Sequence, residues 1–325
     1  MDRPRRVDLE KKGRSLAVLT RAAKPRMARG ARMLRDFFDE LRRHDSHLWR
    51  RAMNAGVAHG PRAFVRYSPP AFGVVFAALL PRYRRAVLRN LRLALGKRSA
   101  AVEALDVARV FATYASCLTE AFLVGEDSGE RVKGVCVHDE RFVDALAAGK
   151  GVILATAHTG GWQVAGPVLH SGHDAELLVV MRRERDAKAQ ALQDGARARS
   201  GTRVIHIGDD PLDALPLLAH LRKGAVVAVQ MDRLPRGMRG RKVELFGSPF
   251  EVPEGPLRLA SVSGAPIVPV FTRRLDYMEY EVEIGEPIHL PRRPAEADLD
   301  GAARKVMSEM EIFVRNNPTQ WFHFE

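Results

Sequence analysis

The chain has 325 residues, 46% of them hydrophobic, and a formal net charge of +13 at pH 7. This length allows one large domain, or a domain with an added helical subdomain. The positive charge indicates an anionic partner, such as nucleic acid, an anionic lipid surface or an acidic protein. The two cysteines, Cys117 and Cys136, have no metal-binding spacing and cannot build a disulfide framework, so we expect no metal site and a reducing compartment.

Residues 1–62 are rich in Arg and Lys and contain few strand signals. We expect them to form a basic N-terminal region, partly disordered and partly helical, ahead of a functional domain of residues 63–325. Within this region, residues 33–51 have the pattern of a basic amphipathic helix, which suits a membrane surface or packing on the domain. The N-terminus lacks the apolar core and cleavage site of a signal peptide.

Residues 67–81 are apolar, but they are fewer than the roughly 20 residues that cross a bilayer. Pro69 and Pro70 open the segment and basic residues flank it on both sides, which is typical of a segment lying in the membrane interface. A buried core helix is the alternative, because periodicity cannot separate the two. We expect no transmembrane segment.

From residue 82 onward, helical and strand-like patterns alternate. The alternation predicts an α/β fold with a mixed, largely parallel central sheet flanked by helices, preceded by a helical, membrane-associating N-terminal region. Helices are expected at residues 82–95, 102–122, 140–148, 162–169, 186–199, 211–222 and 301–316. Strands are expected at residues 135–137, 151–157, 176–181, 204–207, 225–230, 266–272 and 280–284.

His158 directly follows the continuous apolar run of residues 151–157, which is typical of a buried parallel strand. Gly160 and Gly161 then predict a turn, and a helix is expected from Trp162. Sites of open α/β sheets gather at the carboxyl ends of strands, and the glycines would let a substrate approach the backbone. The first N–H groups of the helix could hold an oxyanion, and an imidazole can take a proton from a hydroxyl near neutral pH. We therefore predict that His158 is a catalytic base.

Several blocks occur in order along the chain and together carry a resemblance. They are residues 84–91 (Arg-Arg-Ala-Val-Leu-Arg-Asn-Leu), 157–163 (Ala-His-Thr-Gly-Gly-Trp-Gln), 230–233, 243–249, 252–260, 264–270 and 317–323. In their order and spacing they resemble the bacterial lipid A biosynthesis (late) acyltransferases, the lauroyl/myristoyl transferase group of the lysophospholipid acyltransferase superfamily. The resemblance covers roughly residues 60–325.

The resemblance implies an O-acyltransferase that works at a membrane surface. An acyl thioester, carried by acyl carrier protein or by CoA, would give its chain to a hydroxyl of a lipid or glycolipid, with His158 as general base and no further cofactor. It also implies a peripheral or monotopic protein on the cytoplasmic face of the bacterial inner membrane. The basic surface would then hold anionic membrane lipids and attract an acidic carrier protein.

The family has an acid five residues after its histidine, where this chain has Gln163. Gln163 can hydrogen-bond a ring nitrogen but carries no charge, and the change from Asp to Asn in a catalytic triad lowers the rate by roughly 10⁴. We therefore expect another carboxylate to serve: first Asp232, which follows a core strand, and second Glu254, which is also typical of a turn. The alternative is a catalytically impaired or inactive member that binds acyl chains or lipid.

Four further residues are candidate substrate ligands, beside the two glycines, and Glu254 is one of them. Arg258 stands in a segment that resembles the Pro-Glu-Gly-Thr-Arg phosphate block of the superfamily, although it also suits a surface helix. Arg233 would neutralise an acceptor anion or pair with a nearby acid, and Trp162 would line the acyl channel or belong to the core. A hydrolase with water as acceptor would use the same residues. Nucleic acid is not an expected partner, because no such motif is present.

Overall fold

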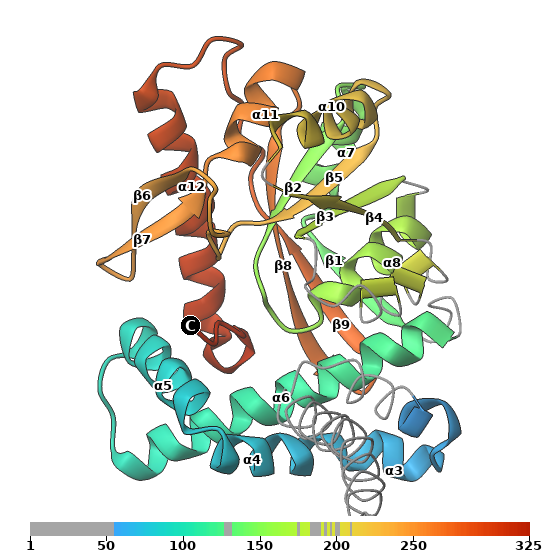
Figure 1. Cartoon of the computed structure of the whole chain (residues 1–325), viewed down its shortest axis with the longest axis vertical. Coiled ribbons are helices and arrows are strands. Elements are labelled where there is room, and N and C mark those ends of the chain that lie inside the picture. The colour runs from blue at the N-terminus through green and yellow to red at the C-terminus, as the bar shows by residue number, and fades with distance from the viewer. Residues whose placement is uncertain are drawn as a thin grey trace, which may run out of the picture. The chain divides into compact units, whose positions relative to one another are not determined.

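The computed structural model describes residues 55–126, 132–173, 176–182, 190–191, 194–195, 197–198, 202–208 and 210–325 (Figure 1). The predicted helix at residues 33–51, and all but eight residues of the basic N-terminal region, lie outside these ranges. Most of the predicted helix at residues 186–199 lies outside them as well. The membrane-associating role of the N-terminal region therefore stays a prediction.

A seven-stranded sheet forms the centre of the fold, in the order β1-β9-β8-β2-β5-β3-β4. Its strands are β1 (Lys133–Val137), β2 (Val152–Thr156), β3 (Leu177–Arg182), β4 (Arg203–Ile207), β5 (Val226–Gln230), β8 (Ile267–Asp276) and β9 (Glu279–Ile284). The five strands from β8 to β4 run parallel to one another, whereas β9 is antiparallel to β8, and β1 is parallel to β9. The predicted α/β class with a mixed, largely parallel sheet is confirmed.

Helices cover both faces of this sheet (Figure 1). They are α3 (Arg62–Tyr67), α4 (Pro69–Leu79), α5 (Pro81–Leu95), α6 (Ala100–Glu126), α7 (Asp139–Ala147), α8 (Trp162–His173), α10 (Leu215–Arg222), α11 (Gly255–Ser263) and α12 (Glu296–Asn316), with the 3-10 helices η2 (Pro211–Ala214) and η3 (Pro318–Gln320). The predicted helix at 301–316 is confirmed, but it begins five residues earlier, where Asp298 caps it by accepting a hydrogen bond from the N–H of Ala295.

Alternation along β2 divides the core between the two faces of the sheet. Ile153 and Ala155 pack in the cluster formed with α10, α11 and α12, whereas Val152 and Leu154 pack in the cluster formed with α7 and α8. All four side chains are buried, because a central parallel strand is covered on both faces. This explains the unbroken apolar run that precedes His158.

A β-hairpin outside the central sheet was not predicted. It consists of β6 (Gly240–Leu245) and β7 (Ser248–Pro253), which are antiparallel and pack against α12. The turn residues Phe246 and Gly247 both have positive φ angles, as tight hairpin turns require. Exposed and buried residues alternate strictly along β6. The sequence shows this alternation only over residues 242–245, because the buried position 241 is an arginine, so the signal for a strand was weak.

Helix α6 confirms the helix predicted at residues 102–122, but its membrane-spanning length was not predicted. Residues Ala100–Val124 are long and apolar enough to cross a bilayer by length and composition, although 44% of the most apolar window is buried within the protein. The helix also carries Glu103 and Glu120, whose buried carboxylates form ion pairs with Arg92 and Arg274. These internal pairs fit a helix that packs in the protein, because such carboxylates are costly in lipid.

Candidate active site

The register between β2 and β5 brings His158 and Asp232 together. Thr156 pairs with Gln230 at the carboxyl ends of these two parallel strands, and the N–H of Met231 donates to the carbonyl of Thr156 at 2.7 Å. His158 and Asp232 each follow two residues after this pair. Equal spacing from the same rung places both side chains at one level, beyond the edge of the sheet.

The imidazole of His158 and the carboxylate of Asp232 form a close pair. His158 Nδ1 lies 2.8 Å from Asp232 Oδ1, and the backbone N–H of His158 donates to Oδ2 of the same carboxylate at 3.1 Å. Asp232 is fully buried, whereas the His158 side chain keeps 19% of its surface exposed. When Nδ1 carries the proton and donates a hydrogen bond to Asp232, Nε2 has a free lone pair. Nε2 is then the nitrogen that can act as a base.

The surroundings of Asp232 keep its carboxyl group ionised. Burial alone would raise the pKa of Asp232, but the charge and hydrogen bond of His158, aided by His323 and Arg233, hold it well below its usual range. The indole N–H of Trp321 also donates to Oδ2 at 3.1 Å. The carboxylate thus accepts three hydrogen bonds, two of them on Oδ2, and these favour its charged form.

The C-terminal segment packs directly against the pair. The N–H of Phe322 donates to the carbonyl of His158 at 2.7 Å, and Trp321 forms a β-bridge with Thr159. The ring of His323 stacks on Trp321 with centroids 5.1 Å apart, and burial lowers the pKa of His323 below its ordinary value despite the opposing charge of Asp232. No local feature of the sequence connected this segment with His158.

Helix α5 also contacts the C-terminal segment, through Asn90. The side-chain amide of Asn90 donates to the backbone carbonyl of His323 at 2.6 Å and lies 3.3 Å from its Nδ1. Asn90 is buried between the exposed Arg89 and Arg92 of the same helix, beside the buried Leu91. The Asn of the Arg-Asn-Leu block therefore has a structural function in holding the segment that carries Trp321.

In the structure, packing explains why the two residues after Thr159 are glycines, whereas the sequence suggested the close approach of a substrate. Gly161 has a φ of +77°, and a Cβ atom there would lie 2.0 Å from the ring of Tyr280. A Cβ atom on Gly160 would lie 2.0 Å from Oε1 of Gln320. Protein side chains occupy the space that a Cβ would need at both positions, so packing favours glycine here. A role of the two glycines in binding substrate stays a prediction.

Helix α8 begins at Trp162, beside the imidazole. The two rings meet edge to face with centroids 5.8 Å apart, so Trp162 forms one wall next to His158. The N–H groups of Trp162 and Val164 donate to the carbonyls of Thr159 and Gly161, at 3.2 and 2.8 Å. Two of the first helical N–H groups are therefore already hydrogen-bonded within the turn. Fewer N–H groups are left to donate to a substrate oxyanion.

Gln163 does not form a hydrogen bond with the His158–Asp232 pair. Its Oε1 is buried and has no hydrogen-bond partner among the described residues, and the same holds for Nε2 of Gln230. Both side chains line a small cavity of about 40 Å³ between α8 and the sheet. The position that carries the family's acid is therefore not joined to the imidazole here, whereas Asp232 is.

A family of known proteins matches this chain. The model of the family "Bacterial lipid A biosynthesis acyltransferase" matches residues 44–325, which is most of the chain. The chain belongs to the bacterial lipid A biosynthesis acyltransferase family. The resemblance deduced from the sequence blocks is thereby confirmed.

Curated relatives within and near this acyltransferase family are of two kinds. A phosphatidylinositol mannoside acyltransferase of Mycobacterium tuberculosis is 34% identical over 127 residues, which is 38% of this chain and 39% of the relative. One from Mycolicibacterium smegmatis is 30% identical over 186 residues, 56% of this chain and 60% of the relative. A lipid A biosynthesis acyltransferase of Haemophilus influenzae is 27% identical over 185 residues, 56% and 55%. The chain thus matches less than two thirds of each relative's length.

The candidate phosphate block lies in an ion-pair cluster. Glu254 binds Arg258 at 2.8 Å and Arg241 at 3.0 Å, and Glu296 bridges the same two guanidinium groups. Glu254 is thus paired with two arginines, and no hydrogen bond joins it to His158. A role of Arg258 in binding a headgroup phosphate stays a prediction, and it would require exchange of these carboxylates.

Arg233 lies on the side of the site formed by the C-terminal residues. Its guanidinium donates to the carbonyl of Phe322 at 3.1 Å, and its Nε lies 3.8 Å from a carboxylate oxygen of Glu325. The positive charge also helps to lower the pKa of Asp232. Of the predicted residues, the structure gathers His158, Asp232, Arg233, Trp162 and the two glycines, but not Glu254 and Arg258.

Proposed function

We propose that this protein transfers a fatty acyl chain from a thioester to a hydroxyl group of a glycolipid, with His158 as general base and Asp232 as the carboxylate that orients it. The observation that supports this most directly is the 2.8 Å contact between Nδ1 of His158 and Oδ1 of Asp232. The contact fixes one tautomer and aims Nε2 away from the buried carboxylate. It is the arrangement that general-base catalysis by histidine needs.

The proposed reaction needs only these two side chains and the two substrates. Nε2 of His158 accepts the proton of the acceptor hydroxyl. At the same time the hydroxyl oxygen forms a bond to the carbonyl carbon of the thioester. The tetrahedral intermediate then breaks its carbon–sulfur bond, and the imidazolium returns the proton to the thiolate that leaves. Asp232 stabilises the imidazolium between these two steps, because its charge lies against Nδ1.

The geometry favours an active enzyme over the impaired alternative. That alternative depended on Gln163, which carries no charge. Asp232 supplies a buried, ionised carboxylate at the imidazole, so the substitution at 163 does not leave His158 without a charged partner. We propose a glycolipid acceptor because the relatives are a phosphatidylinositol mannoside acyltransferase and a lipid A biosynthesis acyltransferase, and both of these lipids carry sugars. The donor is proposed to be acyl carrier protein or CoA.

Helix α4 supports a location at a membrane surface. A helix on the surface of a soluble protein buries its large apolar residues, whereas α4 exposes them. Its buried face consists of small residues, and a Cβ atom on Gly73 would lie 2.3 Å from the carbonyl of Phe111 in α6. Its large apolar residues point outward instead. They are Phe72, Val74, Val75, Phe76 and Leu79, each more than 40% exposed. A contiguous apolar patch of this kind marks a docking surface.

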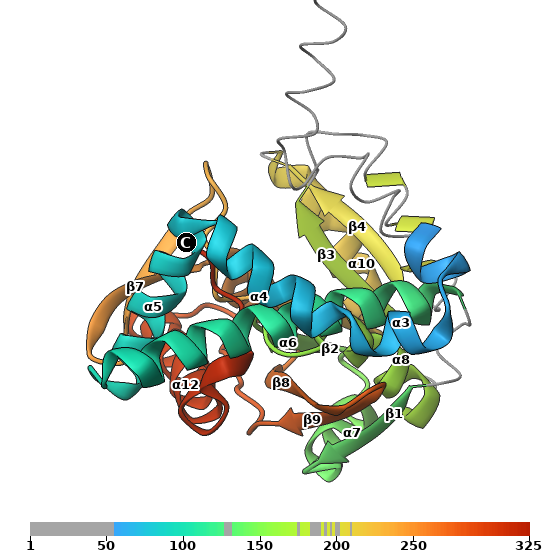
Figure 2. The ribbon, with the colours of Figure 1, turned by 90° about the horizontal axis from the view of Figure 1, so that it is seen from below.

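Basic residues border this exposed apolar patch. Helix α3 precedes it and α5 follows it, and both lie beside α4 and α6 in Figures 1 and 2. Exposed arginines, among them Arg62, Arg66, Arg82 and Arg85, stand on these two helices. Apolar side chains flanked by arginine suit insertion into the interface of an anionic membrane. We propose that the patch seats the protein on the cytoplasmic face of the inner membrane, since the glycolipid acceptor resides in a bilayer.

The proposed reaction is tested by incubating the full chain with labelled acyl thioesters and extracted glycolipids. We expect an acylated lipid product that His158→Ala abolishes. Full activity of that variant would overturn the base assignment, and free fatty acid without acylated lipid would indicate a hydrolase. Lipid profiles of cells that carry each form identify the acceptor.

The proposed membrane seat is tested by co-sedimentation with anionic and neutral vesicles. The double variant Phe72→Ser/Phe76→Ser should bind anionic vesicles at least about tenfold more weakly, because each fully transferred Phe contributes roughly 1.5–3 kcal/mol. Ile312→Ser on α12 is the matched control, since Ile312 is 52% exposed but lies outside the patch. Equal binding of the double variant and the control would overturn the seat.

A further inference from the structure

A second cluster of reactive side chains lies at the edge of the sheet opposite His158. Cys136 stands near the end of β1, a strand that runs antiparallel to β2, and Asp139 opens α7 directly afterwards. His173 ends α8, the helix that begins beside His158. At about 1.5 Å per residue, a helix of this length places His173 roughly 18 Å from the catalytic end. The cluster is therefore separate from the proposed acyltransferase site.

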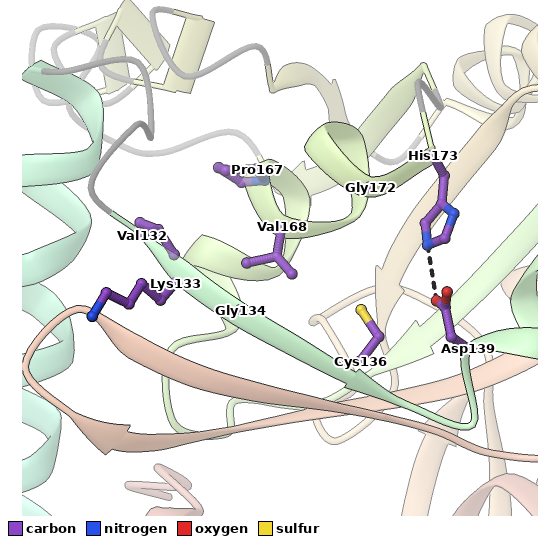
Figure 3. A pocket seen from close by; sticks show the side chains of 9 residues that line it. All are labelled: Val132, Lys133, Gly134, Cys136, Asp139, Pro167, Val168, Gly172 and His173. Carbon is purple, nitrogen blue, oxygen red and sulfur yellow. Dashed lines mark hydrogen bonds and ion pairs between the residues drawn. The ribbon is translucent and has the colours of Figure 1, made fainter.

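The three side chains point into one space (Figure 3). Their ligand atoms, the sulfur of Cys136, a carboxylate oxygen of Asp139 and a ring nitrogen of His173, all lie within 4.8 Å of one another. Nε2 of His173 is 2.8 Å from Oδ1 of Asp139. The group lines one end of a cavity of about 480 Å³. Solvent reaches it, because the Asp139 side chain is 41% exposed.

The backbone around the cluster keeps the three groups at these distances. A Cβ atom on Gly134 would lie 2.4 Å from Cγ1 of Val168, so α8 packs directly on β1. Lys133 lies at the other end of the cavity in Figure 3, and its ammonium group pairs with Glu279 at 3.0 Å. The lysine therefore does not occupy the space between the three candidate ligands.

We propose that Cys136, Asp139 and His173 bind a thiophilic divalent cation of the zinc type. Sulfur, imidazole nitrogen and carboxylate oxygen are the donors that zinc takes in proteins, usually four in a tetrahedron. Three protein ligands leave the fourth position open toward the cavity, for water or a small ligand. No metal site was expected from the sequence, because its cysteines and histidines show no metal-binding spacing. The three candidate ligands lie on three different elements, which only the structure brings together.

Binding of the cation has a free-energy cost, because the three side chains already interact with protons and with one another. Burial, aided by the Asp139 carboxylate, raises the pKa of the Cys136 thiol to about 11, so the cation must displace a thiol proton. It must also replace the hydrogen bond between His173 and Asp139. The competing explanation is that this hydrogen bond alone ties α7 to α8 and that the thiol is a bystander.

The test is equilibrium dialysis of the tag-free full chain against Zn²⁺, with metal measured by mass spectrometry. We expect a site that Cys136→Ser and His173→Ala each weaken at least about tenfold. Cys117→Ser is the matched control, because Cys117 is a buried thiol on α6 outside the cluster. Co²⁺ should give a thiolate-to-cobalt absorption band that is lost in Cys136→Ser and kept in Cys117→Ser.

A measurement on the unaltered protein keeps the proposal testable if a variant does not fold. Zn²⁺ should slow alkylation of Cys136 by iodoacetamide, as read by peptide mapping, and a chelator should restore it. Absence of protection overturns the proposal. Zinc binding that is unchanged in Cys136→Ser also overturns it, because the cation would then be held elsewhere, for example by His206 and Asp194, which lie 2.7 Å apart.

Discussion

The indole N–H of Trp321 donates to Oδ2 of Asp232 at 3.1 Å, while Oδ1 of the same carboxylate contacts His158. The hydrogen bond comes from 89 residues further along the chain. It fixes Oδ2, so that Oδ1 stays directed at Nδ1 of His158. Trp321 is thus a positioning residue for the proposed base.

Trp321→Phe tests this positioning role. The variant keeps an aromatic ring beside His323 but removes the donor to Asp232, so kcat should fall about tenfold, the equivalent of one hydrogen bond to a charged group. KM should change little, because Trp321 is buried and its N–H donates to Asp232. Steady-state acyl-transfer kinetics provide the measurement. A fall in folding stability with unchanged kcat at low temperature would show that the residue is only structural.

Asp232→Asn should reduce kcat far more than Trp321→Phe does. An amide at this position presents an N–H group to donors and no longer stabilises the Nδ1–H tautomer, and in a serine-protease triad the equivalent change costs roughly 10⁴ in kcat. Thermal melting should show that the variant is folded. A loss of less than about tenfold would contradict the assignment of Asp232 as the orienting carboxylate.

The same carboxylate should make a contribution to stability that depends on pH. The pKa of Asp232 is lowered in the folded protein, so its contribution is fully present above the pKa of unfolded Asp, about 3.9. It is lost as the pH falls from there through the folded pKa. The difference in unfolding free energy between the natural protein and Asp232→Asn should therefore shrink as the pH falls below about 4. A difference that grows in acid would contradict the lowered pKa.

Neighbouring parallel strands explain how much of this site the sequence could predict. His158 and Asp232 each follow a strand of strongly apolar character, and the carboxyl ends of parallel neighbours share an edge. That rule was sufficient to nominate Asp232. The contacts of Trp321 with Asp232 and of Asn90 with His323 were not predictable. The partners are separated by 89 and 233 positions along the chain, and no local sequence pattern records contacts over such distances.

Strand direction and helix exposure mark the limits of the fold prediction. The residues of β8 and β9 predicted two strands, but the hydrophobic pattern does not encode that β9 runs against β8. The apolar run of α4 left a core helix and an interfacial helix equally open. Only the packing of Gly73 against α6 shows which face is inside, because a small residue is buried where a large one would be expected.

Gln163 offers a direct test of which position supplies the charge. Gln163→Glu should give no gain in kcat, because Asp232 already supplies a carboxylate to His158. Gln163→Leu should keep kcat within about tenfold and leave stability unchanged or higher, since it removes a buried acceptor that has no partner among the described residues. A large gain from Gln163→Glu in acyl-transfer assays would show that the site lacks its acid and would favour the impaired alternative.

Glu120 on α6 should be required for the fold around the catalytic turn. Its buried carboxylate accepts hydrogen bonds from Arg274 at 2.9 Å and the N–H of Met278 at 3.0 Å, and also from the hydroxyl of Tyr280, the ring that packs on Gly161. Glu120→Leu leaves the guanidinium unpaired and should cost roughly 3–5 kcal/mol of unfolding free energy. Glu120→Gln keeps the shape and part of the bonding, so it should cost less.

Denaturant unfolding of the two Glu120 variants provides the measurement, with acyl transfer assayed below their melting temperatures. Because Tyr280 fills the space beside Gly161, loss of its partner should also loosen the turn that carries His158. Glu120→Leu should therefore lose activity at temperatures at which it is still folded, whereas Glu120→Gln should retain most of it. Equal stability of both variants would show that the buried charge pair contributes nothing beyond its packing.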